Sequence, residues 1–223
     1  TRNDRTVPRP LEVCREIRDT GLRFVGIKDV GLAPSLLPEL TAEIHQAGQG
    51  AVLELVSLDR DAEIDWANAA VEAGVDYLLG GAHADAVSEA VAGSRTSYLP
   101  FAGRVSGRPT RLDGTASEIV ASARRLVKLR GVYGIDLLAY RAGGDAAELT
   151  RAVVRAVKVP VIAAGGVNSD ERIRNLVAAG VWGFTVGTAL FDGTYAPEAR
   201  SLPERIARIL AVSGAAAGAM ETG

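Results

Sequence analysis

Cysteine, aromatic side chains and an excess of positive charge are all scarce in this chain, and each absence excludes a class of protein. Cys14 is the only cysteine, so no disulfide can form within the chain and a disulfide-rich secreted scaffold is excluded. The 25 basic residues are outnumbered by 27 acidic ones, which argues against a nucleic-acid-binding surface. No apolar run approaches the roughly 18 residues that a membrane-spanning helix needs, and no signal peptide is visible. We therefore predict a cytoplasmic protein without a nucleic-acid or membrane partner.

The core has to be built from small and aliphatic residues. Hydrophobic residues make up 48% of the 223 positions, yet only four are Phe and two are Trp. Many short buried strands packed against helices have this composition. A chain of this length suits one α/β barrel, so we expect residues 1–223 to form a single domain.

One sequence unit recurs along the chain. A polar, amphipathic stretch ends in glycine and is followed by a short apolar run and then by a polar or glycine-rich turn. Glycine after a helix suits a left-handed C-cap, and short, continuously apolar runs are typical of parallel strands that are buried on both faces. The predicted strands lie within residues 23–27, 51–56, 75–79, 97–101, 134–138, 159–163 and 183–186.

Strict alternation of these strands with helices predicts an α/β fold with a parallel sheet. A closed (β/α)8 TIM barrel needs one strand more than the seven that we find. Because residues 11–20 are predicted to form a helix, we expect residues 1–10 to be the loop that leaves a first strand largely missing from this chain. The alternative is an open, doubly wound sheet. The barrel is favoured because the chain has no glycine-rich dinucleotide fingerprint early in a β-α unit.

The last two predicted strands carry a candidate phosphate site. Gly165 and Gly166 follow one strand and precede a helix, so the backbone there can approach a ligand without a Cβ in the way. Gly187 and Thr188 end the last strand, where a short helix can point free N–H groups at an anion. In barrel numbering these strands are the seventh and eighth, which often bind phosphate. Neither half is specific alone, but together they predict a phosphate-binding pair.

The run from Pro160 to Gly193 resembles the C-terminal quarter of the ribulose-phosphate-binding barrels. It is most similar to their histidine-biosynthesis isomerase and cyclase branch. The resemblance implies that backbone N–H groups at Gly165, Gly166, Gly187 and Thr188 hold a substrate phosphate. Flavin-dependent barrels use similar loops for FMN, so the resemblance indicates phosphate more firmly than it indicates a substrate.

Charged and polar side chains at the predicted C-terminal strand ends are the candidates for chemistry, because barrel enzymes place their catalytic groups there. Lys28 closes an apolar strand. Glu54, if it points inward, needs a cationic partner such as Lys28. His83 can act as an acid or base near neutral pH, and Asp4 follows the inferred first strand. We predict these four as catalytic, and Arg104, Arg141 and Tyr140 as substrate-binding.

The stretch from Val105 to Ser117 is the longest irregular segment that we predict. It is polar, glycine-rich and basic, and it follows the fifth barrel strand. Its position predicts a mobile lid over the barrel mouth, with an ordinary surface loop as the alternative.

The chain departs from the pattern of the histidine branch. Members of that branch resemble one another in carrying one catalytic Asp after the first strand and a second after the fifth. Asp4 or Asn3 suits the first place, but Arg104 stands at the second. The sixth strand also ends in Tyr140 and Arg141 without the usual acid. The pattern of the ribulose-phosphate epimerases fails as well, since no set of metal ligands is visible.

We therefore predict an enzyme that binds a small phosphorylated metabolite, such as a sugar phosphate. It would catalyse isomerisation, epimerisation or a related proton-transfer or C–C step, as an isomerase or lyase. The alternatives are an FMN-binding oxidoreductase, a Schiff-base aldolase or synthase that uses Lys28, and a non-catalytic phosphosugar-binding protein. For the preferred function no cofactor is predicted, and a homo-oligomer is possible.

Overall fold

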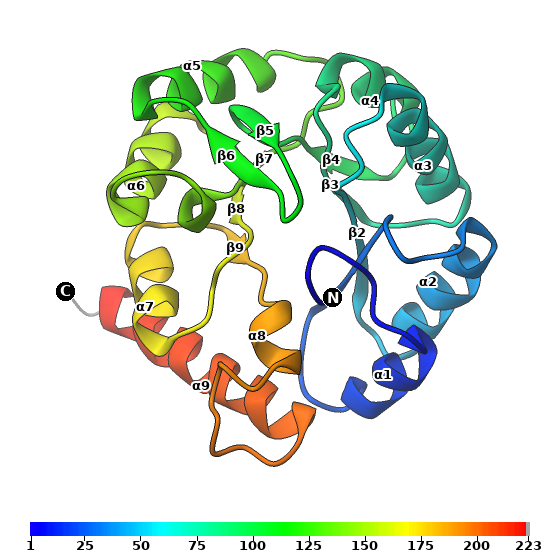
Figure 1. Cartoon of the computed structure of the whole chain (residues 1–223), viewed down its shortest axis with the longest axis vertical. Helices are drawn as coiled ribbons and strands as arrows, with labels where there is room; N and C mark the ends of the chain where they lie inside the picture. Colours follow the sequence, from blue (N-terminus) through cyan, green and yellow to red (C-terminus); the bar gives the residue numbers. More distant parts are fainter. Residues whose placement is uncertain (222–223) are drawn as a thin grey trace.

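A ring of helices surrounds a curved parallel sheet, as expected for an α/β fold of the (β/α)8 type (Figure 1). The computed structural model describes the backbone of residues 1–221 and the side chains of residues 1–217. All of the strands predicted from the sequence are present. They are β1 (Phe24–Lys28), β2 (Gly50–Leu55), β3 (Tyr77–Gly80), β4 (Ser97–Leu99), β7 (Ile135–Leu137), β8 (Val161–Ala163) and β9 (Gly183–Phe184).

The strands form two parallel sheets in the orders β1-β2-β3-β4 and β7-β8-β9. Isolated parallel bridges between Tyr98 and Val132, and between Phe101 and Asp136, join β4 to β7, so the two sheets continue into each other. No pairing between β1 and β9 is found in residues 1–221. Residues 1–9 form an irregular segment with one bridge between Arg2 and Arg5, and the side chain of Thr6 bonds to the backbone of Lys28.

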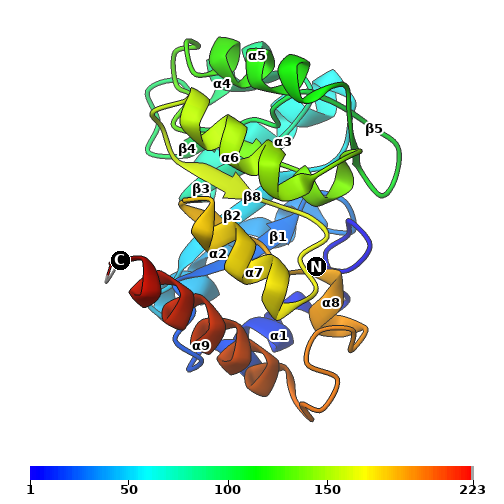
Figure 2. The same cartoon turned by 90° about the vertical axis from the view of Figure 1, so that its left-hand side faces the viewer.

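The helices begin where the sequence supplies capping side chains. Ser169 accepts from Arg172 N–H and caps α7, and Thr115 and Glu118 form a capping box on α5. None of the helices within residues 1–221 is long and apolar enough to cross a membrane. The helices are α1 (Pro10–Ile17), η1 (Pro34–Leu36), α2 (Leu37–Gln46), α3 (Arg60–Glu72), α4 (Ala84–Ala90), α5 (Ala116–Leu126), η2 (Ala139–Arg141), α6 (Ala146–Ala156), α7 (Asp170–Ala178), α8 (Thr188–Phe191) and α9 (Leu202–Glu221). Figure 2 shows α7 and α9 side by side on the outside of the barrel.

Side chains that point into the barrel change character along its axis. The N-terminal end holds an aromatic group in which the ring of Tyr77 lies 5.4 Å from both Phe24 and Trp182. Aliphatic side chains follow, among them Val52, Leu79 and Ile162. Charged side chains come last, at the C-terminal strand ends. Since β1 and β2 pair in parallel with Lys28 opposite Glu54, their alternation brings these two side chains inward together.

The segment that we predicted as irregular is partly regular. Residues 105–117 include most of an antiparallel hairpin formed by β5 (Arg104–Ser106) and β6 (Arg111–Asp113). Turn residues Gly107, Arg108 and Pro109 separate two short alternating strands, a pattern that permits a hairpin and that the sequence reading missed. The hairpin reaches from the β4 end toward the centre of the barrel (Figure 1), so the segment does lie over the mouth.

Candidate functional site

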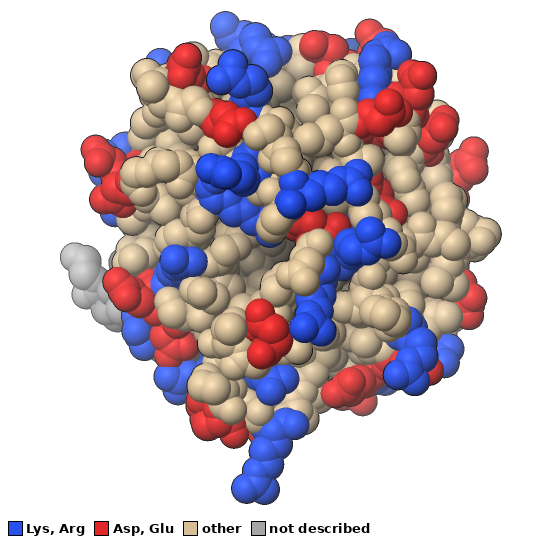
Figure 3. Space-filling model, in the orientation of Figure 1, with Lys and Arg blue, Asp and Glu red and all other residues tan. Residues whose placement is uncertain are grey.

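A cavity of about 670 Å³ opens at the mouth and extends down the barrel between β1 and β9. Its upper part is lined by predicted catalytic residues and by the glycines of the predicted phosphate site. Figure 3 shows Lys and Arg side chains gathered around the centre of this face, with acidic groups between them. The lining residues that matter for chemistry are Asp4, Lys28, Glu54, Arg141, Gly165, Gly166 and Gly187.

Lys28 is the centre of the charged group. Its Nζ lies 2.9 Å from Oδ1 of Asp4 and 2.9 Å from Oε2 of Glu54. The three side chains are only 4% to 9% exposed. The prediction that Glu54 points inward and pairs with Lys28 is therefore confirmed by the geometry.

Arg141 holds the other side of Asp4. Its guanidinium approaches both carboxylate oxygens, with Nη1 at 2.6 Å from Oδ2 and Nη2 at 2.9 Å from Oδ1. The hairpin contributes Thr110, whose N–H donates to Asp4 and whose carbonyl accepts from Arg141. Two carboxylates, two cations and the hairpin thus form one connected network.

The network keeps Asp4 and Lys28 ionised. Burial opposes the charge on Asp4, but the hydrogen bonds and charges of Arg141 and Lys28 more than offset it, so the pKa of Asp4 lies below its ordinary value. Burial also opposes the charge on Lys28, yet the charges of Glu54 and Asp4 raise the pKa of Lys28 above its ordinary value. Lys28 is consequently an ammonium ion and Asp4 a carboxylate at neutral pH.

The Gly165–Gly166 turn lies directly against this network. Both residues have positive φ, 72° and 73°, which favours glycine. A Cβ on Gly165 would overlap the Arg141 side chain, and one on Gly166 would come within 2.8 Å of Cβ of Tyr140. These glycines are therefore explained by backbone conformation and packing even before any ligand is considered.

Gly187 and Thr188 lie beside that turn because β9 pairs in parallel with β8. The N-terminal segment covers them. The Thr188 hydroxyl accepts from the N–H of Asn3, and a Cβ on Gly187 would lie 2.8 Å from the Thr1 hydroxyl. The predicted short helix after Gly187 is present as α8.

Tyr140 packs behind the glycine turn. Its ring lies 4.6 Å from the Arg172 guanidinium carbon, and its hydroxyl donates to the Arg172 carbonyl. It does not belong to the cavity lining. The geometry gives Tyr140 a supporting position behind Gly166, and direct contact with a substrate stays a prediction.

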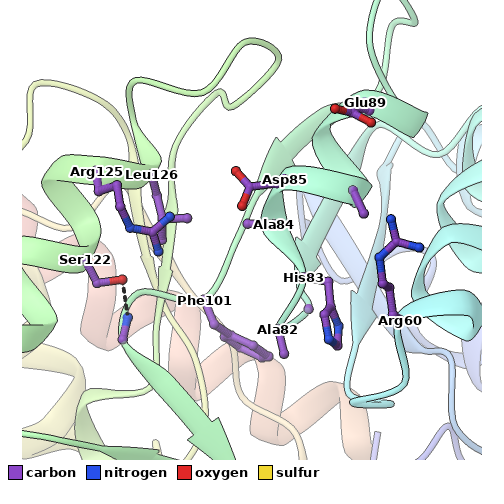
Figure 4. A pocket seen from close by; sticks show the side chains of 13 residues that line it. Arg60, Ala82, His83, Ala84, Asp85, Glu89, Phe101, Ser122, Arg125 and Leu126 are labelled. Atoms are coloured by element: carbon purple, nitrogen blue, oxygen red, sulfur yellow. Dashed lines mark hydrogen bonds between the residues drawn. The ribbon is translucent and has the colours of Figure 1, made fainter.

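Two predicted site residues lie elsewhere. Arg104 is exposed on β5 and does not line the cavity. His83 lines a separate pocket of about 290 Å³ between the β3–α4 loop and α5, with Arg60 and Arg125 on its walls (Figure 4). The structure therefore does not bring His83 or Arg104 together with Lys28, and the roles predicted for them stay predictions.

Glu63 explains the position of His83. This fully buried carboxylate accepts from the N–H groups of Ala82 and His83, and it lies 3.2 Å from Nδ1 of His83. Glu63 lies in the first turn of α3. A charged residue at that position is ordinarily expected on the surface, so the sequence did not predict this contact.

Two further residues lie near the main cavity: Thr110, which nothing in the sequence indicated, and Asp136, which the sequence placed inside a strand as a structural residue. Thr110 is buried under the hairpin and tied to Asp4 and Arg141. Asp136 is completely buried inside β7. Strand alternation could have found Asp136, because it stands between the outward-facing Ile135 and Leu137. In the part of the chain that the structure describes, no cluster of His, Cys, Asp and Glu could hold a metal ion.

The chain is similar to known proteins in both sequence and fold. Residues 141–196, which include Arg141 and both glycine turns, match the family model described as histidine biosynthesis protein. A Syntrophotalea carbinolica protein is 30% identical over 165 residues, which are 65% of this chain and 67% of that protein. The chain belongs to the ribulose-phosphate-binding barrel superfamily, near the histidine-biosynthesis isomerase branch.

The Syntrophotalea protein is named 1-(5-phosphoribosyl)-5-((5-phosphoribosylamino)methylideneamino) imidazole-4-carboxamide isomerase. A Halobacterium salinarum protein of the same name is 37% identical over 86 residues. That match covers 37% of this chain and only 36% of the Halobacterium protein. Among solved structures, thiamine phosphate pyrophosphorylase from Pyrococcus furiosus superposes with a TM-score of 0.62 at 17% identity, over 94% of this chain and 91% of that one. At that identity the likeness shows the barrel fold alone.

Proposed function

We propose that this superfamily member is an isomerase that binds a small phosphorylated metabolite at the barrel mouth. One observation carries the proposal: Arg141 lies against the Gly165 turn and also binds Asp4, which shares Lys28 with Glu54. An anion at the glycine turn would therefore lie beside a carboxylate base and two cations within one cavity.

The phosphate would be held by backbone N–H groups at Gly165, Gly166, Gly187 and Thr188. Positive-φ glycine turns leave such groups pointing at a common anion. Arg141 would add a charge-assisted contact from the side of the network. For this to happen the N-terminal residues at Gly187 must leave room, because Thr1 and Asn3 contact that turn.

Glu54 is the proposed base. It lines the cavity and forms an ion pair only with Lys28 among the described residues. Its carboxylate would remove the proton from the carbon next to a substrate carbonyl, and the bonding electrons would move onto the carbonyl oxygen. The Lys28 ammonium would stabilise the resulting enediolate, and the proton of the adjacent hydroxyl would pass to the former carbonyl oxygen. Glu54 would return its proton to the former carbonyl carbon.

The names of the relatives support an isomerase over the other classes, and phosphoribosyl groups in those names support a phosphorylated sugar as substrate. At Arg104 and Tyr140 the chain departs from the pattern of the histidine branch. We therefore propose only the class of substrate and not a particular sugar.

The experiment uses a panel of phosphorylated aldoses and ketoses in D2O with NMR detection. Proton removal next to the carbonyl would replace one substrate C–H by C–D while interconverting aldose and ketose. We expect Glu54→Gln to abolish both changes and Arg125→Ala, in the separate pocket, to leave them intact. Binding without exchange in the unaltered protein would instead support a phosphosugar-binding protein.

A Schiff base at Lys28 is less well supported. Its amine would have to lose a proton before attacking a carbonyl, and two carboxylates hold it as an ammonium ion. Borohydride trapping followed by mass spectrometry tests this alternative, since only an imine gains a permanent adduct at Lys28. A flavin absorption band in the purified protein would reveal the FMN alternative.

A further inference from the structure

Asp136 is a buried acid that the proposed mechanism does not use. It lies inside β7 and is completely buried, and neither carboxylate oxygen has a well-aligned hydrogen-bond partner. The backbone N–H of Leu137 is near the carboxylate and favours its charged form less than Lys28 or Arg141 does. A buried ionised carboxylate without a hydrogen bond is strongly disfavoured. Its inward direction aims it into the charged layer at the barrel mouth, although it is not itself part of the cavity lining.

The groups that face Asp136 come from the surrounding strands and from the loop after β7. Glu54 on β2 and Lys28 on β1 act on it electrostatically, as does Arg141 on η2. Tyr98 on β4 is a further titratable neighbour. Its hydroxyl donates to the Gly80 carbonyl and so is not directed at Asp136.

The charges of the buried group do not balance when every member is ionised. Its acids are Asp4, Glu54 and Asp136, whereas its cations are only Lys28 and Arg141. One added proton makes the group neutral overall.

Hydrogen bonding shows which acid holds that proton. Asp4 is bound by both cations and Glu54 by Lys28, so each is paired as an anion. Asp136 has no such partner. Burial, and then the charge on Glu54, raise the pKa of Asp136 well above its ordinary range.

We propose that Asp136 is a positioning residue that holds one proton at neutral pH and thereby lets the cavity accept an anionic phosphate ester. The idea rests on the proposed function, because it assumes that an anion binds at the mouth. Loss of the proton at alkaline pH would place an extra negative charge beside Glu54. The affinity of the cavity for anions would then fall. Ionised Asp136 would also compete with Glu54 and Asp4 for the positive charge of Lys28.

The first test reads the proton directly, without a ligand. The infrared difference spectrum between the unaltered protein and Asp136→Asn is recorded at pH 7 in D2O. We expect the unaltered protein to show a carbonyl band of a protonated carboxylic acid that the variant lacks. Loss of a carboxylate band alone would overturn the proposal. Should Asp136→Asn fail to fold, the unaltered protein is titrated by itself. The acid band should be present at pH 7 and give way to a carboxylate band at alkaline pH, and its absence at pH 7 would overturn the proposal.

The second test reads the coupling to anion binding. Sulfate is the probe because its charge is constant from pH 6 to pH 10, and its affinity is measured by calorimetry. The unaltered protein is expected to bind sulfate about tenfold more weakly at the alkaline end, whereas Asp136→Asn should change less than about twofold. Parallel pH profiles would overturn the coupling. An acid band in a protein that binds no sulfate would contradict the phosphate site and leave the proton on Asp136 established.

Discussion

Two glycine turns on opposite sides of the barrel have the same local form and different surroundings. Gly80–Gly81 follows β3 and Gly165–Gly166 follows β8, and all four residues have positive φ. At the first turn the carboxylate of Glu63 accepts from the amides that follow, those of Ala82 and His83. At the second, no carboxylate among the described residues accepts in this way, and the turn faces Arg141 and the cavity.

The difference shows that a glycine pair after a strand indicates a left-handed backbone turn and does not by itself indicate a bound ligand. An internal carboxylate already occupies the position that an anion would take at the first turn. At the second turn the carboxylate of Asp4 is bound by Arg141 and Lys28, and binding of a substrate phosphate by the amides there stays a prediction. Substitutions of Asp4, Glu63 and neighbouring residues test this difference between the two turns.

The largest effect is expected for Asp4→Asn. Removing one partner from a buried ion pair leaves uncompensated charge, so the free energy of unfolding at pH 7 should fall by about 3 kcal/mol. The pKa of Asp4 is lowered in the folded state, so its contribution is present above the unfolded pKa and is lost as the pH falls through the folded value. Denaturant unfolding of both proteins between pH 7 and pH 3 should show the difference shrinking with acidity. A constant difference would contradict the ion-pair assignment.

Glu63→Ala is expected to follow, with a loss of about 2 kcal/mol, because two amides lose their acceptor in a buried setting. Sulfate affinity should change less than about twofold, since the first turn is not part of the cavity. Glu63→Gln is the matched control, because it keeps one acceptor oxygen and should lose less stability. A tenfold loss of sulfate affinity in either variant would show that both glycine turns belong to one anion-binding site, contrary to the difference described above.

Gly165→Ala should have a smaller effect on stability and a clear one on binding. A left-handed alanine costs about 1 kcal/mol, and its Cβ would displace Arg141. We expect sulfate to bind about tenfold more weakly by calorimetry. Gly143→Ala, on the loop before α6, has nothing within 4 Å of an added Cβ and should change neither quantity. Equal effects of the two substitutions would show that the turn makes no specific contribution.

Arg104→Ala should have the smallest effect. The side chain is exposed on β5 and lies outside the cavity, so the stability change should stay within about 0.5 kcal/mol. Sulfate affinity should also stay unchanged. A marked loss of affinity would mean that the hairpin closes further over the mouth in the bound state, which would restore the role predicted for Arg104 from the sequence.

Local patterns were enough to predict most of the fold. Glycine-terminated helices and short apolar runs located every parallel strand. The hairpin was missed because β5 and β6 are short, largely exposed strands without the apolar signal of the buried ones. A hairpin of that kind depends on pairing between its own strands, which composition alone does not reveal.

The site was predictable only where strand ends determine it. Lys28 and Glu54 were identified because alternation places neighbouring strand ends on one face of a parallel sheet, and the paired register bears this out. Asp136 obeys the same rule but was set aside as structural, since nothing local shows that its carboxylate lacks a partner.

The sequence by itself determined the barrel, its strand order and the residues at each strand end, because these follow from local periodicity and from the geometry of parallel strands. Tertiary structure alone decided that Glu63 fills one glycine turn, that Arg141 reaches from Asp4 to the other, and that His83 and Arg104 lie apart from Lys28. These outcomes depend on where long side chains from distant elements end and on which charges are left without a partner. Burial sets both, and burial is a property of the assembled fold.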